Sequence, residues 1–174
     1  MKTILAAIDF SENSKLVIET AATLARSVGA RVAFLHVIQP ISGTASEYGF
    51  AEACDKIARA AVLNAVHRLA HIQRRLSSEG ISATASYVSG VPGSAIVKRA
   101  KQLQAEYIVI GSHGHGALYE LIVGGTASRV IKEASCPILV VPSSAQSAND
   151  ALSFDSEPAE APEGRQPLAF SAQQ

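Results

Sequence analysis

Two glycine-containing segments in the C-terminal half of the chain have the residue types and spacing of a phosphate-binding site. The first is Gly-Ser-His-Gly at 111–114, and the second is Gly-Gly-Thr at 124–126, after nine intervening residues. An apolar run precedes the first segment, and an amphipathic run at 127–134 follows the second. A strand that ends in a glycine-rich loop before a helix lets the backbone approach an anion and points unpaired N–H groups at it. The pattern predicts phosphate binding.

The elements that must position these loops alternate along the chain. Apolar runs predict strands at 3–8, 31–38, 82–88, 106–110 and 137–141, and helical patterns lie between them, at about 52–78, 93–103 and 127–134. Ser11 or Ser14 is the expected cap of the first helix, and Gly29 is its expected stop. The stripe that this helix is expected to bury consists of Leu16, Thr20, Leu24 and Val28.

Strict alternation of strands and helices implies right-handed crossovers and a parallel sheet covered on both faces. We therefore predict a doubly wound, Rossmann-like α/β fold with five parallel strands. In this topology the strand order reverses between the first and fourth strands, and ligands bind outside their carboxyl ends. Asp9 follows one of these strands and Gly111 follows the other. The fold and the glycine pattern thus predict the same site.

Composition narrows the class of protein. The chain has 174 residues, of which 48% are hydrophobic and 5% aromatic, and its fifteen basic residues balance fifteen acidic ones. A balanced charge gives no global field to attract nucleic acid or an anionic membrane, and no run is long enough for a membrane helix. Cys54 and Cys136 lie far apart and form no metal or redox motif. We expect two reduced thiols in a cytoplasmic protein.

The composition changes near residue 143. The segment 144–174 is rich in Ser, Ala, Pro, Glu and Gln and has no amphipathic period. Such a segment cannot bury enough apolar surface to offset the entropy of ordering it. We expect one domain over residues 1–143 and a flexible polar tail over 144–174.

Several candidate residues also have an ordinary structural explanation. Asp9 is suited to cap a turn or the first helix as well as to bind a ligand, and Thr126 is suited to both roles at the last helix. His113 and His115 are expected at the rim of the loop, where protonation would add local positive charge. His36 lies within a buried run and is expected to be a hydrogen-bonded core histidine.

The ordered motifs resemble the universal stress protein family in its nucleotide-binding form. The resemblance is carried by Ala-Ile-Asp-Phe-Ser-Glu at 7–12, Leu-His-Val-Ile at 35–38 and Gly-Val-Pro at 90–92. The most specific part is the glycine pattern from Gly111 to Gly124, which runs on into Ser-Cys-Pro-Ile-Leu-Val-Val at 135–141. The resemblance covers roughly residues 1–142 and implies an adenine nucleotide alpha hydrolase-like fold.

What the resemblance implies can be placed residue by residue. Asp9 would lie beside the adenosine, and Val37 would contact adenine through its backbone. Gly111, Gly114 and Gly124 would shape the loops around the ribose and phosphates, together with Ser112 and His113. The position after Gly124 is usually Ser or Thr in the family, whereas here it is Gly125 and the hydroxyl follows on Thr126.

The resemblance implies an ATP-binding stress or regulatory protein. Because the chain has no net charge, the attraction for the phosphates must be local, and Mg²⁺ or Mn²⁺ bound through the phosphates is one expected source of it. No residue pattern supplies an evident catalytic base, so we expect hydrolysis to be slow at most. A P-loop kinase would need Gly-Lys-Ser or Gly-Lys-Thr, and an adenylating enzyme of the related type would need Ser-Gly-Gly after the first strand; both are absent. A family member that works through protein contacts alone remains the alternative, because Gly125 departs from the motif.

Association with other proteins is also expected. Members of the family generally pair through the last strand, and the apolar run at 138–141 would otherwise leave an exposed sheet edge. We predict a homodimer joined at this strand, with a regulatory protein partner that the sequence does not identify.

Overall fold

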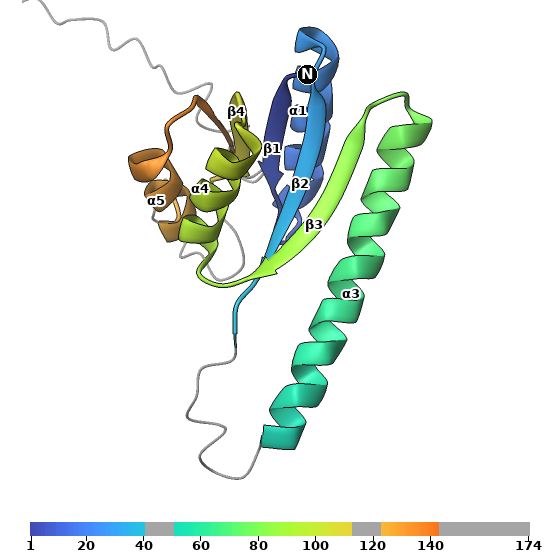
Figure 1. The fold of residues 1–174 in the computed structure, drawn as a ribbon, viewed down its shortest axis with the longest axis vertical. Coiled ribbons are helices and arrows are strands. Elements are labelled where there is room, and N and C mark those ends of the chain that lie inside the picture. Colours follow the sequence, from blue (N-terminus) through green and yellow to red (C-terminus); the bar gives the residue numbers. More distant parts are fainter. Residues whose placement is uncertain (41–50, 113–122, 143–174) are drawn as a thin grey trace, which may run out of the picture.

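The computed structural model describes residues 1–40, 51–112 and 123–142 of the chain. Its centre is a five-stranded sheet in the order β3-β2-β1-β4-β5, and every neighbouring pair of strands is parallel. The strands are β1 (Thr3–Ala7), β2 (Arg31–Ile38), β3 (Ala83–Ser89), β4 (Tyr107–Gly111) and β5 (Ile138–Val141). The predicted reversal of strand order therefore lies between β1 and β4, as in a doubly wound fold (Figure 1).

Helices cover both faces of this sheet. The helices are α1 (Asn13–Val28), α3 (Ala51–Ser78), α4 (Pro92–Leu103) and α5 (Gly125–Glu133). Alternate side chains of β1 point to opposite faces, so Ile4 packs with the core under α1 and α3, and Leu5 packs with the core under α4 and α5. A strand buried on both faces is apolar throughout, which explains why the central runs show no polar alternation.

The predicted elements are confirmed, with boundary shifts of one or two residues. The expected buried stripe of α1 is wrong, however. The residues that α1 buries are Asn13, Ser14, Val17, Ile18, Ala21, Ala22 and Ala25, whereas the predicted Leu16, Thr20, Leu24 and Val28 are only half-buried. Small side chains let the helix approach the sheet closely, so the larger leucines are displaced to the flank of the same core.

The predicted ends of α1 have different outcomes. Gly29 ends the helix in the left-handed region (φ 65°), as predicted, where glycine carries no steric penalty. The predicted serine cap is wrong, because the N-cap is Glu12 and no side chain caps the helix. Ser11 and Ser14 instead donate their hydroxyls to Asp9.

Three further predictions concern the cysteines, membrane-spanning helices and the C-terminal tail. Cys54 and Cys136 are both unbonded, and burial raises the pKa of the Cys136 thiol. Among the helices in the described ranges, none combines the length and the apolar character needed to cross a bilayer. The predicted tail at 144–174 lies outside the described residues.

Candidate functional site

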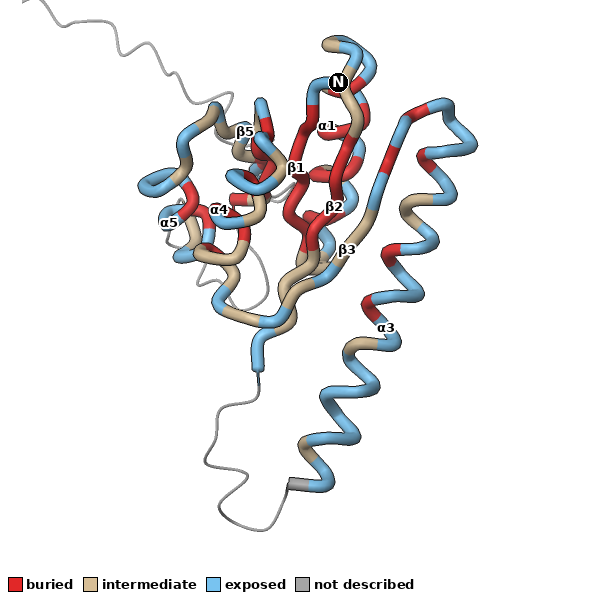
Figure 2. The backbone as a smooth tube through the Cα atoms, viewed as in Figure 1, coloured by how far each residue is buried: buried red, intermediate tan, exposed pale blue. Residues whose placement is uncertain are grey.

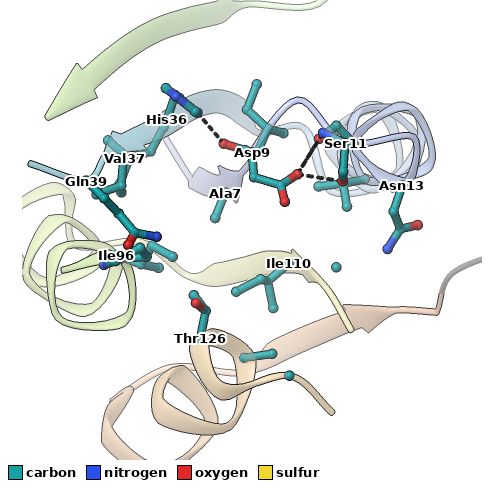
Figure 3. Close-up of a pocket in the computed structure, with 18 of the residues that line it drawn as sticks. Ala7, Asp9, Ser11, Asn13, His36, Val37, Gln39, Ile96, Ile110 and Thr126 are labelled. Atoms are coloured by element: carbon teal, nitrogen blue, oxygen red, sulfur yellow. Dashed lines mark hydrogen bonds between the residues drawn. The ribbon is translucent and has the colours of Figure 1, made fainter. Parts of the chain in front are cut away.

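A pocket of about 600 Å³ lies at the carboxyl edge of the sheet, beside the point where β1 and β4 diverge. Its size is within the range of about 300–1,000 Å³ that is typical of small-molecule sites. The ends of β1, β2 and β4 form one part of its wall, and the starts of α1 and α5 form another (Figure 3).

Asp9 follows β1 and is held by a compact set of hydrogen bonds. Its Oδ1 accepts from the backbone N–H of Ser11 (3.0 Å), from the Ser11 hydroxyl (2.6 Å) and from the Ser14 hydroxyl (2.9 Å). The bond from the Ser11 N–H closes a turn across Phe10, which adopts φ 63°. This left-handed conformation is rare for a bulky residue and costs roughly 1–2 kcal/mol, so the surrounding contacts must enforce it. The turn fixes the carboxylate at the pocket (Figure 3).

The Phe10 ring contacts two polar side chains. His36 of β2 packs on it with a centroid separation of 4.3 Å, and the guanidinium carbon of Arg68 lies 4.2 Å from the ring centroid. The Nδ1 of His36 donates to the carbonyl of Ile8 (2.9 Å), which fixes the proton on that nitrogen. His36 is therefore hydrogen-bonded as predicted, but it is half-buried and lines the pocket rather than lying in the core.

The carboxyl end of β4 is joined directly to the start of α5. Ser112 is buried, its N–H donates to the carbonyl of Val141 (2.7 Å), and its carbonyl accepts from the N–H of Gly124 (2.7 Å). These two bonds bring Gly111 and Gly124 to the same side of the pocket although they are thirteen positions apart in the sequence. The two glycine segments found in the sequence thus meet in space.

The first turn of α5 presents backbone donors and little side chain. Gly124 is its extended N-cap, no side chain caps the helix, and its first turn contains no acidic residue. Gly125 and Thr126 are exposed and line the pocket. The N-terminus of a nine-residue helix carries uncapped N–H groups and a partial positive charge, and both favour an anion.

The wall beside β2 is more apolar. Val37, Ile38 and Gln39 line it at the end of β2, and Ile96 lines it from α4 (Figure 3). Apolar walls of this kind suit a flat ring, and backbone groups at a strand end suit its polar edge. The pocket therefore combines an apolar part near β2 with a donor-rich part at α5.

Asn13 is a pocket residue that the sequence pattern did not reveal. It is buried at the start of α1, and its Nδ2 donates to the carbonyl of Val141 (3.2 Å). Its Oδ1 is buried with no hydrogen-bond partner within the described part of the chain. Phe10 and Arg68 were missed as well, because their contacts join positions 58 residues apart and no local pattern reports them.

Seven of the nine predicted site residues line this single pocket, namely Asp9, Val37, Gly111, Ser112, Gly124, Gly125 and Thr126. The other two, His113 and Gly114, lie outside the described residues, as does His115. In the three described ranges no group of three or more His, Cys, Asp or Glu side chains is arranged to hold a metal ion.

Comparison with known proteins shows the family of the chain. A family model for the universal stress protein family matches residues 1–142. A universal stress protein of Thermus aquaticus, encoded in the QAH/OAS sulfhydrylase 3′ region, is 32% identical over 152 residues, which cover 80% of this chain and 98% of the relative.

Solved structures share the fold. Protein MJ0577 of Methanocaldococcus jannaschii aligns with a TM-score of 0.70 and 27% identity, covering 82% of this chain and 96% of that one. An Archaeoglobus fulgidus universal stress protein in complex with dAMP aligns with a TM-score of 0.57 and 22% identity over 81% of this chain and 97% of that one. A third solved structure, of a universal stress protein in complex with cAMP, aligns with a TM-score of 0.56 and 20% identity, covering 81% of this chain and 96% of that one. The family model and the Thermus relative, together with this fold, show that the chain belongs to the universal stress protein family.

Proposed function

We propose that this protein binds an adenine nucleotide, ATP in particular, in the pocket between β1, β2, β4 and α5. The observation that carries the proposal is the convergence of two distant glycine segments and Asp9 on one pocket of suitable volume. The structures of related proteins with dAMP and cAMP support a nucleotide as the ligand class.

The pocket suggests how the parts of the nucleotide would be held. The base would lie on the apolar part near Val37, where backbone groups of β2 can meet its edge, with Asp9 beside the adenosine. The ribose would lie along Gly111 and Ser112. The phosphates would receive the N–H groups of Gly124 to Thr126 and the Thr126 hydroxyl, where the start of α5 stabilises negative charge. Mg²⁺ or Mn²⁺ would bind through the phosphates of ATP.

We propose a regulatory rather than a catalytic role. Rapid hydrolysis requires a group that positions and activates a water next to the terminal phosphate. In the described part of the pocket the ionisable side chains are Asp9 and His36, and both are engaged in structural hydrogen bonds on the side of β1 and β2. Hydrolysis would therefore be slow, and the nucleotide would act as a ligand that changes which partner is bound.

Nucleotide retention provides the direct test of this proposal. The protein is purified, denatured, and its supernatant is analysed for absorbance at the adenine wavelength and by mass spectrometry. Release of an adenine nucleotide in stoichiometric amount supports the proposal. If no nucleotide is released and none binds on addition, the alternative family role, through protein contacts alone, takes its place.

A homodimer formed through β5 is part of the proposal. β5 is the edge of the sheet, and Leu139 on it remains 39% exposed in the single chain. An open edge with an exposed apolar side chain can pair with a second copy. We expect Leu139→Glu to convert a dimer into a monomer, with a dissociation constant at least about tenfold higher, since it places two like charges at the interface.

Light scattering coupled to gel filtration measures this effect. Leu63→Glu is the matched control, because Leu63 is 71% exposed on α3, which packs on the opposite edge of the sheet. A wild-type protein that elutes as a monomer, or a Leu139→Glu variant that remains a dimer, would refute the predicted interface.

A further inference from the structure

Helix α3 is longer than the strands on which it packs. It has 28 residues, which span about 42 Å, whereas the eight residues of β2 span about 26 Å. Its buried residues Ala65, Leu69 and Leu76 all lie in its C-terminal half, and none of residues 52–64 is buried (Figure 2). The N-terminal half therefore extends past the carboxyl edge of the sheet, where the pocket opens (Figure 1).

Two residues of α3 face this end of the sheet. Ala61 lines the pocket together with Val37, Ile38 and Gln39 at the end of β2. Arg68 is seven positions further along, which is two helical turns, so it projects from nearly the same side of the helix. A methyl group at position 61 leaves space in the pocket that a larger side chain would occupy.

Arg68 joins α3 to the turn that holds Asp9. Its guanidinium lies over the Phe10 ring at 4.2 Å, and its Nη2 donates to the Phe10 carbonyl (3.3 Å). The ring also packs on His36, which is itself hydrogen-bonded to the carbonyl of Ile8. Arg68 thus contacts both the ring and the backbone of a residue in a strained conformation (φ 63°).

We propose that α3 is a wall of the nucleotide site, in which Ala61 contacts the bound nucleotide on its base side and Arg68 positions the Asp9 turn through Phe10. This inference rests on the proposed nucleotide binding and adds a specificity determinant to it, because the side chain at position 61 limits what fits beside β2. Ala61 is a binding residue in this account, and Arg68 is a positioning residue.

Tryptophan fluorescence tests the role of Ala61 directly. The chain contains no tryptophan, so Ala61→Trp introduces a single reporter, and Ala60→Trp is the matched control on the adjacent exposed position that does not line the pocket. Both variants are titrated with AMP and with Mg-ATP by fluorescence and by calorimetry. A base next to the indole stacks on it and changes its emission.

We expect nucleotide to change the emission of Ala61→Trp by at least about a third and to leave that of Ala60→Trp unchanged, because a stacked base alters the indole environment. Loss of binding in Ala61→Trp alone would equally support a wall at this position. Binding to both variants with no emission change in Ala61→Trp would refute it. If the wild-type protein binds neither nucleotide, the proposed function itself is wrong.

Arg68 is tested by nucleotide affinity. Arg68→Gln removes the cation from the Phe10 ring, and we expect affinity to fall about twofold to fivefold, as for a cation–π contact of 0.5–1 kcal/mol. Arg68→Lys keeps the charge and should recover most of the affinity, whereas the exposed Arg74→Gln on the same helix should have no effect. If Arg68→Gln binds nucleotide with the same affinity as the wild type, Arg68 does not position the Asp9 turn for nucleotide binding.

Discussion

Gly125→Glu should abolish nucleotide binding while leaving the fold at least as stable. Within the described part of the chain, a Cβ at Gly125 would meet no neighbouring atom within 4 Å, so the change causes no clash with these residues. A carboxylate at this position faces the phosphates across a few ångströms, and repulsion from two or more negative charges exceeds about 3 kcal/mol, or about 100-fold in affinity. The same carboxylate lies in the first turn of α5, where it interacts favourably with the helix dipole, and the substitution also removes a glycine from the helix. The two effects together should raise the free energy of unfolding by roughly 1 kcal/mol.

Two further variants separate the effect of charge at position 125 from the effect of side-chain size. Gly125→Gln has nearly the same shape without the charge and should lose far less affinity than Gly125→Glu. Gly125→Ser adds the hydroxyl usual at this position in the family and should strengthen binding by about tenfold, as for a hydrogen bond to a charged group. Calorimetry measures affinity and thermal denaturation measures stability. Equal affinity of the wild type and Gly125→Glu would place the phosphates elsewhere.

Asp9→Ala should lower both stability and affinity. The substitution removes the acceptor of three hydrogen bonds and releases the turn that Phe10 makes at φ 63°. Bonds to a charged acceptor contribute about 1.5–3 kcal/mol each but share one oxygen in a half-exposed turn, so we expect the free energy of unfolding to fall by about 2–3 kcal/mol. Nucleotide affinity should fall as well, because Asp9 is expected beside the adenosine.

Asp9→Asn is the matched control for this prediction. Its amide oxygen can still accept from Ser11 and Ser14, so the loss of stability should stay near 1 kcal/mol. Urea denaturation gives the stability of each variant, and calorimetry gives its affinity at a temperature where all are folded. If Asp9→Ala unfolds at the same urea concentration as the wild type, the turn does not depend on this carboxylate.

The order of the elements could be predicted from the sequence because each is encoded locally. Buried parallel strands are continuous apolar runs, and Gly29 marks a helix end by a conformation that few other residues adopt. The buried face of α1 could not be predicted in the same way. Two faces of that helix carry apolar residues, and the choice between them depends on how closely alanines such as Ala21 and Ala22 approach the sheet.

The candidate site likewise contains residues that the sequence could predict and contacts that it could not. Asp9 follows β1, Gly111 ends β4 and Gly124 is the N-cap of α5, so fold topology places them at one edge of the sheet before any contact is known. The roles of Ser11 and Ser14 as donors to Asp9, and of Arg68 on Phe10, depend on side-chain directions in a strained turn and on a helix 58 residues away. The family motifs do not reveal such contacts, because they consist of the residues expected to touch the ligand and not of the residues that hold these in place.

Titration calorimetry with Mg-ATP at up to millimolar concentration, on protein freed of any ligand that co-purifies, tests nucleotide binding most directly. We predict a saturable heat with one nucleotide per chain, and loss of that heat in Gly125→Glu. A flat titration for the wild type, with AMP and ADP equally silent, would contradict the account and leave a protein that acts through its surfaces alone.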